Sequence, residues 1–163
     1  MTMGFVQNPK AIPLPGRVII IGVGRFMRMA RVKQLTVWLE NASGELGRIA
    51  QALGRAKVDI TAFTAYGAGV SCPIRLQVSN PTKAKEVLLG LGLRVTEEEV
   101  LRVTLAGKPG LLENLATRLG EAHINVEYAY AAAPRGKKTL DMVLSVSDVA
   151  GARKILDQLV SGA

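Results

Sequence analysis

The sequence is poor in cysteine, in aromatic residues and in long apolar runs, and each shortage excludes something. Cys72 is the only cysteine among 163 residues, so an intramolecular disulfide is excluded and a reducing compartment, the cytoplasm, is expected. Aromatic residues make up only 4% of the chain, so leucine, valine, isoleucine and alanine must build the core. No apolar run approaches the roughly 18 residues that span a bilayer, so we expect no membrane partner.

Patterns of catalytic and metal-binding residues are also missing. His123 is the only histidine and no Gly-x-Ser-x-Gly motif accompanies it, so a Ser-His-Asp hydrolase is not indicated. Cys72 has no metal-ligand partner at a recognisable spacing. The three carboxylates of 97–99 are interpreted as a solvated linker rather than as a metal site. We therefore expect a protein that is not an enzyme and that holds no cofactor and no metal.

The net charge of +8 is concentrated at the N-terminal end. Residues 1–33 hold six basic side chains and no acidic one, which leaves 15 basic and 13 acidic side chains for the rest of the chain. A polyanion would therefore bind mainly to this segment. We interpret 1–31 as a basic N-terminal extension, either flexible or the product of a start codon that was set too early.

What the sequence does contain is an internal repeat with an offset of 66 residues. Between 34–60 and 100–126, nine positions are identical and others keep their apolar character. The identical pairs are Leu35/Leu101, Val37/Val103, Leu39/Leu105, Gly44/Gly110, Leu46/Leu112, Ala50/Ala116, Leu53/Leu119, Gly54/Gly120 and Ala56/Ala122. Further along the offset becomes 68, as in Leu76/Leu144. Two copies of one supersecondary unit indicate a tandem fold.

Hydrophobic periodicity predicts the same order of elements in both copies. The first copy is predicted to have strands over 35–39, 59–66, 70–78 and 93–96, with helices over about 44–56 and from Pro81 onward. Ser43 is expected to cap the first of these helices. The second copy is predicted to have strands over 100–105, 125–131 and 140–147, with helices starting near Pro109 and spanning about 149–159. Its fourth strand is missing, and either Val18–Ile21 or a partner subunit is expected to supply it.

The order of these elements, together with two short motifs, resembles the ACT domain. The motifs are Lys108–Leu112, with the sequence Lys-Pro-Gly-Leu-Leu, and Ala122–Val126, with the sequence Ala-His-Ile-Asn-Val. Residues 32–160, about four-fifths of the chain, are similar to small proteins made of two ACT domains. The resemblance implies an α+β fold of two ferredoxin-like βαββαβ units in tandem, with antiparallel sheets and helices on one face. We expect the first ACT domain at 32–97 and the second at 98–163.

The resemblance also implies a function. ACT domains bind free amino acids reversibly and regulate metabolic enzymes or act as sensors, so we expect a non-catalytic amino-acid-binding regulator. We expect a homodimer or larger homo-oligomer, with an enzyme of amino-acid metabolism as a second partner. One alternative is the regulatory small subunit of an acetolactate-synthase-type enzyme. A nucleic-acid-binding protein of the same fold is another, but the predicted strands lack the aromatic stacking pattern. No motif supports an acylphosphatase-like hydrolase.

The predicted ligand sites are the two loops that follow the first strand of each copy. Each loop leads into a helix N-terminus, where free N–H groups and the helix dipole favour an α-carboxylate. Leucines beside the loops would shape an apolar pocket, and Asp59 or Asn125 would accept the ammonium group. The second loop is favoured because Asp59 adds negative charge to the first. The site residues are Gly107, Lys108, Pro109, Gly110, Leu111, Leu112 and Asn125 in the second copy, and Asn41, Ser43, Gly44, Glu45, Leu46 and Asp59 in the first.

Overall fold

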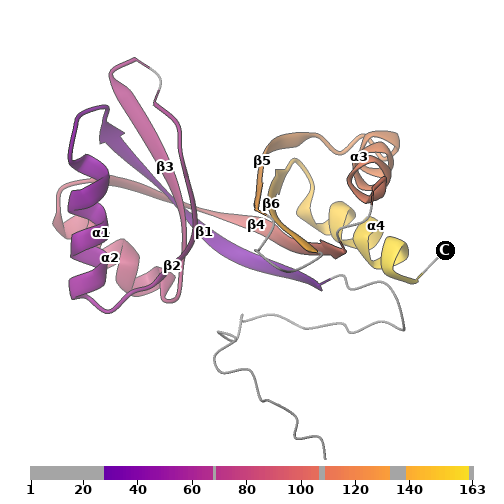
Figure 1. The fold of residues 1–163 in the computed structure, drawn as a ribbon, viewed down its shortest axis with the longest axis horizontal. Coiled ribbons are helices and arrows are strands. Elements are labelled where there is room, and N and C mark those ends of the chain that lie inside the picture. The colour runs from indigo at the N-terminus through magenta and orange to yellow at the C-terminus, as the bar shows by residue number, and fades with distance from the viewer. Residues whose placement is uncertain (1–27, 68, 107–108, 133–138, 162–163) are drawn as a thin grey trace, which may run out of the picture.

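The computed structural model describes residues 28–67, 69–106, 109–132 and 139–161. These residues form six strands and four helices (Figure 1). In chain order the elements are β1 (Arg28–Glu40), α1 (Glu45–Arg55), β2 (Ile60–Ala65), β3 (Ser71–Val78), α2 (Pro81–Gly90), β4 (Arg94–Ala106), α3 (Leu111–Glu121), β5 (Val126–Ala132), β6 (Thr139–Val146) and α4 (Val149–Ser161). The predicted α+β fold of two βαββαβ units is confirmed, with α2 beginning at Pro81 as expected.

All six strands form one antiparallel sheet with the order β2-β3-β1-β4-β6-β5. The two central strands, β1 and β4, are the longest, with 13 residues each. They pair along most of their length, and Lys33 lies opposite Glu99, the residue at the equivalent position of the repeat. An approximate two-fold axis therefore passes between these two residues and relates the two units.

Each central strand belongs to both units. Residues 28–33 of β1 pair with the half of β4 that adjoins β6, whereas 35–40 pair with β3. The fourth strand that the second copy lacks is therefore supplied by 28–33, directly before the first unit, and needs no partner subunit. Val18–Ile21, the segment expected to supply it, lies outside the described residues.

The interpretation of 97–99 as a solvated linker is wrong. β4 runs without a break from Arg94 to Ala106, so the strands predicted over 93–96 and 100–105 are one strand. The domain boundary predicted between residues 97 and 98 falls inside it. The structure has no linker there because the end of the first unit and the start of the second are the same piece of sheet.

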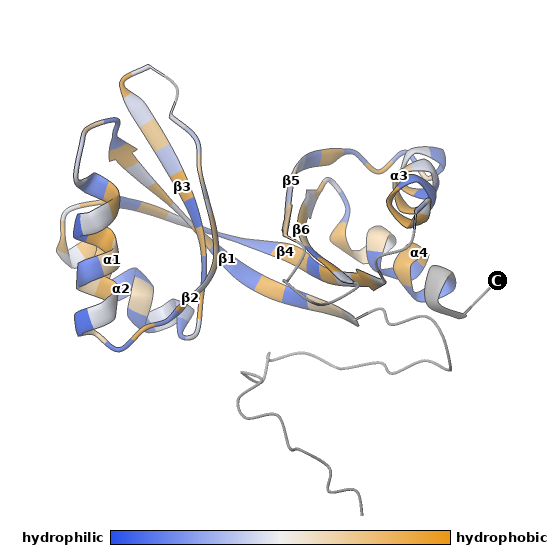
Figure 2. Ribbon diagram, in the orientation of Figure 1, coloured by the Kyte–Doolittle hydropathy of each residue, from blue (hydrophilic) through white to orange (hydrophobic). Residues whose placement is uncertain are grey.

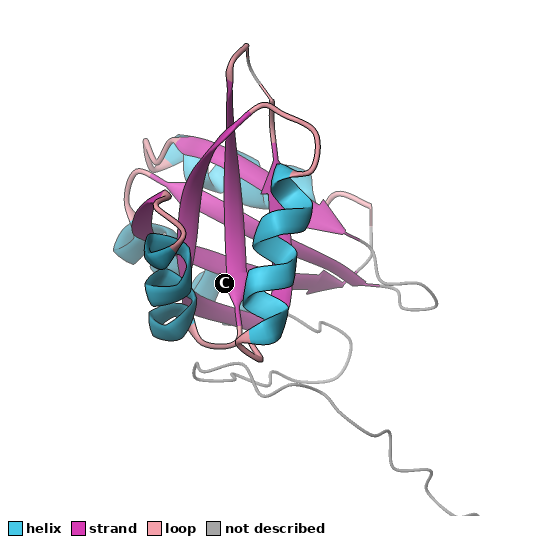
Figure 3. Cartoon of the chain, turned by 90° about the vertical axis from the view of Figure 1, so that its left-hand side faces the viewer, coloured by secondary structure: helices cyan, strands magenta, loops and turns pink. Residues whose placement is uncertain are grey.

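The four helices cover the same face of the sheet, in two pairs at opposite ends of the molecule (Figures 1 and 3). Under α1 and α2 lies a core that includes Leu35, Val37 and Leu76, and under α3 and α4 lies a second core that includes Leu101 and Leu144. Between the two pairs no helix covers the middle of β1 and β4, where Figure 2 shows hydrophilic residues. The sequence pattern therefore alternates strongly at the ends of these strands and is lost in their centres.

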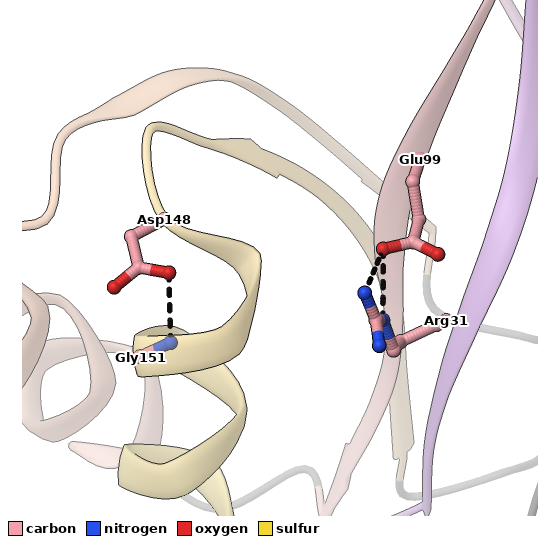
Figure 4. Close-up of polar contacts among 4 residues, drawn as sticks. All are labelled: Arg31, Glu99, Asp148 and Gly151. Carbon is pink, nitrogen blue, oxygen red and sulfur yellow. Dashed lines mark hydrogen bonds and ion pairs between the residues drawn. The ribbon is translucent and has the colours of Figure 1, made fainter.

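Ion pairs cover this uncovered middle segment on the helix side. Arg31 bonds to Glu99 through two guanidinium nitrogens, as Figure 4 shows, and the Lys33 ammonium lies 2.8 Å from the Glu97 carboxylate. The cross-strand pairs place all four side chains on the same face of β1 and β4. They satisfy the charges of the exposed middle segment without a covering helix.

The opposite face of the sheet is concave, because the sheet folds back on itself. The guanidinium carbon of Arg75, on β3, lies 4.1 Å from the centre of the Tyr128 ring, on β5. In the sheet order three strands separate β3 from β5. We call this helix-free surface the concave face.

Candidate functional site

The two loops predicted to bind a ligand end in the same backbone conformation. Gly44 and Gly110 directly precede α1 and α3 and have φ angles of 92° and 86°. Only glycine adopts this left-handed conformation without strain. Neither helix has a side-chain cap, so Ser43 does not cap α1 as predicted. The Glu45 N–H of α1 donates a 3.5 Å bond to the Ala42 carbonyl. The other N–H groups among the first three residues of each helix make no bond to a described residue, so they are left to solvent or to a ligand.

The two helix N-termini differ in charge. In α1 the first residue is Glu45, whose carboxylate accepts a 2.6 Å bond from Arg48. This hydrogen bond lowers the pKa of Glu45. In α3 the equivalent first residue is Leu111, and Asn114 replaces the arginine. A ligand carboxylate would therefore meet a carboxylate on the first residue of α1, whereas in α3 the acidic residue of the first turn is Glu113, the third residue.

The rest of the first loop is held by the chain itself. The side-chain amide of Asn41 donates a 2.9 Å bond to the carbonyl of Gly69, and its backbone N–H donates to Val70. Asn41 therefore fastens the loop to the turn between β2 and β3. In the second loop Pro109 is exposed, whereas Gly107 and Lys108 lie outside the described residues.

Leucine side chains stand beside both helix N-termini. Leu46 and Leu112 are 43% and 51% exposed, and Leu111 is half-buried. A hollow of about 530 Å³ runs from Gly110 along α3. It is lined by Gly110, Glu113, Asn114, Thr117, Arg118 and Glu121. The second site thus combines free N–H groups, apolar surface and an open hollow.

The structure does not bring Asp59 and Asn125 to these loops. Each residue follows the C-terminus of its helix, about 16 Å from the N-terminus at 1.5 Å per residue. Their backbone groups exchange bonds with Ser79 and Ser147 at the ends of β3 and β6. The Asn125 amide also donates to Glu127. Neither side chain can accept a hydrogen bond from the ammonium group of an amino acid bound at the loop of its own unit. The residue that disfavours the first site is therefore Glu45 and not Asp59, as the sequence had suggested.

Sequence reasoning missed a polar network on the concave face. Glu98 accepts hydrogen bonds from Tyr128 (2.6 Å), Gln34 (3.1 Å) and Thr36 (3.2 Å), and its other oxygen from Ser145 (3.5 Å). Gln34 is fully buried. The repeat does contain a signal, because valine stands at the counterparts of two of these residues, Val100 for Gln34 and Val32 for Glu98.

Tyr128 and Tyr130, whose hydroxyl donates to the Gln34 side chain, are both held in the protonated form. Burial, and then the hydrogen bond to Glu98, raises the pKa of Tyr128 to about 12. Burial also raises the pKa of Tyr130, while Arg102 and Arg75 oppose the rise. Both guanidinium groups therefore lie near the Tyr130 hydroxyl, so the concave face carries cations as well as the Glu98 carboxylate.

The structure also places His123 and Cys72, the two residues considered in the sequence for catalysis or metal binding. His123 is exposed in a left-handed conformation after α3, and Cys72 packs against the first core. Among the described residues no group of His, Cys, Asp and Glu is placed to hold a metal ion. None of the described helices is long and apolar enough to cross a membrane.

The family follows from these features and from a direct comparison. The model of the ACT domain pair matches residues 29–157, a range that begins inside β1 and ends inside α4. The chain therefore belongs to the family of ACT domain pairs. A comparison with curated proteins found no match.

Solved structures share the fold at low sequence identity. A protein from Bacteroides thetaiotaomicron is 24% identical over 78% of this chain and 88% of its own, with a TM-score of 0.74. The regulatory subunit of aspartate kinase from Thermus thermophilus is 12% identical over 85% of this chain and 98% of its own, with a TM-score of 0.63. The corresponding subunit from Thermus flavus is 13% identical, covering 86% and 99%, with a TM-score of 0.57.

Proposed function

We propose that the protein is a non-catalytic cytoplasmic regulator that binds a free amino acid and thereby controls an enzyme of amino-acid metabolism. Membership in the family of ACT domain pairs and the similarity to regulatory subunits of aspartate kinase support this class of function.

The observation that carries the proposal is the N-terminus of α3. Its N–H groups have no side-chain cap, and its first residue is Leu111 where α1 has Glu45, although Glu113 lies later in the same turn. An α-carboxylate would accept from these N–H groups in the field of the helix dipole. The exposed Leu112 would contact the ligand's side chain.

The ammonium group of the ligand needs an acceptor from elsewhere, because Asn125 lies at the far end of α3. A second copy of the chain, packed beside the first, would supply acceptors, so ligand binding would favour the dimer. A ligand shifts an equilibrium only by its differential affinity for the two states, and here the dimer alone has the complete site. The regulated enzyme would sense this change in assembly.

The experiment is calorimetric titration of the full chain with each of the twenty amino acids, repeated with Leu111→Glu. This substitution copies Glu45 and should abolish binding at α3, while the added charge at the helix N-terminus should leave stability unchanged or slightly higher. Glu45→Leu is the matched control and should not weaken binding at α3. Heat of binding that Leu111→Glu does not reduce would overturn this site, and absence of binding by every amino acid would overturn the function.

Sedimentation at several protein concentrations tests the link to assembly. The amino acid that binds should increase the fraction of dimer in the wild type and not in Leu111→Glu. A dimer fraction that is the same with and without ligand would contradict a shared site. Nucleic-acid binding is the weaker alternative, because Tyr128 and Tyr130 face the concave network instead of an open sheet surface.

A further inference from the structure

A cavity of about 510 Å³ lies on the concave face, between β2 of the first unit and β5 and β6 of the second. Its volume is within the range of about 300–1,000 Å³ that is usual for small-molecule sites. One wall is formed by 60–64 and the other by residues that include Ala131 and Val143. The cavity is separate from the loop at Gly110, because the helices that the loops lead into pack on the opposite face of the sheet.

Two opposite charges line this cavity. Arg102, half-buried on β4, makes no hydrogen bond or ion pair with any other described residue. Asp141, half-buried on β6, accepts a 2.6 Å bond from Thr104 at one carboxylate oxygen, which leaves the other oxygen for a ligand. Half-buried charges are costly when no opposite charge pairs with them, so Arg102 and Asp141 favour occupation by complementary charges.

The sheet register fixes how far apart the two charges are. Arg102 lies opposite Val143, and Asp141 lies opposite Thr104, two residues along β4. The two residues are therefore diagonal neighbours on one face, with backbones about 7–8 Å apart. They do not form an ion pair with each other, and a molecule that carries a cation and an anion a few bonds apart fits between them.

We propose that this cavity is a second binding site, which takes the zwitterionic group of an amino acid with an apolar side chain. The Arg102 guanidinium holds the α-carboxylate through two N–H groups, and the free oxygen of Asp141 accepts from the ammonium. Ala62, Ala132 and Val143 form apolar walls for the side chain. The inference rests on the proposed function insofar as the ligand is again a free amino acid.

The surrounding charges favour a ligand without net charge. Glu98 is used by its four hydrogen bonds, and Arg75 lies against the Tyr128 ring. The remaining pair, Arg102 and Asp141, sums to zero, so a zwitterion balances it where a lone anion or cation would not. The first unit has no equivalent pair of charges, because Thr36 and Pro73 stand at the positions equivalent to Arg102 and Asp141.

The test is calorimetric titration of the full chain with valine, leucine, isoleucine, methionine and phenylalanine, and with the amide and the N-acetyl derivative of whichever binds. Arg102→Gln and Asp141→Asn should each weaken binding of the amino acid by about 10- to 100-fold. The amide lacks the carboxylate and should bind the wild type and Arg102→Gln equally. The N-acetyl derivative lacks the ammonium and should bind the wild type and Asp141→Asn equally. Urea unfolding verifies that both variants fold.

Leu111→Glu separates this proposal from the function proposed above. If binding is lost in Arg102→Gln and Asp141→Asn but kept in Leu111→Glu, the concave site stands and the loop site fails. If only Leu111→Glu loses binding, the concave site is wrong and the loop site stands. Two molecules bound per chain, each lost with its own variant, support both sites. Absence of binding by all five amino acids overturns the concave site.

Discussion

The hydroxyl of Tyr130 donates a 2.7 Å hydrogen bond to the side-chain carbonyl of Gln34, which precedes it by 96 residues. Tyr130 lies on β5 at one edge of the sheet, and Gln34 lies in the middle of β1. The bond crosses the concave face and helps to hold the two halves of the sheet at a fixed angle. Gln34 is fully buried, so its oxygen has no access to water as a substitute partner.

Tyr130→Phe should therefore destabilise the protein. The substitution leaves the Gln34 oxygen buried and without this bond, which costs about 1–3 kcal/mol in the free energy of unfolding. Urea unfolding measures the change. Tyr66→Phe is the matched control, because Tyr66 is 69% exposed and should lose almost nothing. Equal stability of the two variants would show that the bond across the concave face contributes nothing.

Stability should also fall in alkaline solution through Tyr128. Its pKa is raised from about 10 in the unfolded chain to about 12 in the folded one, so the folded state favours the neutral phenol. This contribution is complete below pH 10 and is lost as the pH rises to 12. The free energy of unfolding, measured from pH 8 to 12, should decrease less steeply in Tyr128→Phe than in the wild type. Parallel curves would contradict the prediction.

Much of the fold could be predicted from the sequence because the repeat marks both cores. Leu35 and Val37 coincide with Leu101 and Val103, and each pair lies under its own helices. The helix starts at Asn80–Pro81 also follow from local chemistry, since the Asn80 side chain accepts a 3.0 Å bond from the Lys83 N–H. These features depend on short-range periodicity and capping, which a single sequence shows directly.

The exchange of the central strands could not be predicted in this way. At 97–99 both faces of β4 are polar, for two different reasons. Glu97 and Glu99 pair with Lys33 and Arg31 on the uncovered side, while Glu98 joins the buried network. Three consecutive acidic residues do not alternate between polar and apolar, so the sequence pattern gives no sign of a strand there. The concave cavity likewise depends on a sheet that folds back on itself, which no local pattern records.

Replacing two helical glycines with alanine should stabilise the protein, whereas replacing a third should not. Gly54 and Gly120 are equivalent residues near the ends of α1 and α3, and an added methyl group would meet nothing within 4 Å. Gly54→Ala and Gly120→Ala should each stabilise the protein by about 0.5–1 kcal/mol. At Gly151 the methyl carbon would overlap a carboxylate oxygen of Asp148.

Gly151→Ala should give no such gain, because Asp148 would have to move. The other carboxylate oxygen of Asp148 accepts a 2.9 Å bond from the Gly151 N–H and caps α4, as Figure 4 shows. Loss of a helix cap costs about 1 kcal/mol, which is enough to cancel the stability gained from the higher helix propensity of alanine. Thermal unfolding of the three variants compares them. Equal stabilisation by all three would show that Asp148 accommodates the methyl group freely.

The ends of α1 and α3 carry a second equivalent pair, Lys57 and His123. Both have positive φ angles, 55° and 56°, in a helix-ending motif whose usual residue is glycine. Gly92 occupies the corresponding position after α2, with a φ of 74°. Lys57→Gly and His123→Gly should each stabilise the protein by up to about 1 kcal/mol, and Gly92→Ala should destabilise it by a similar amount. Chemical denaturation measures all three, and a loss of stability in both glycine variants would refute the argument.

Removal of residues 1–33 should damage the second unit more than the first. The deletion takes away the strand 28–33 that pairs with 99–104, and with it Met29, which packs against the second core. We expect the free energy of unfolding to fall by more than about 2 kcal/mol, by comparison with substitutions that replace a buried methionine with alanine. Hydrogen exchange should quicken at 99–104, whose partner strand is gone, while the segment 74–78 in the first unit keeps its protection. A chain that begins at Arg28 is the matched control, because it retains every described strand. Equal protection of 99–104 in the two truncated chains would mean that β1 does not complete the second unit in solution.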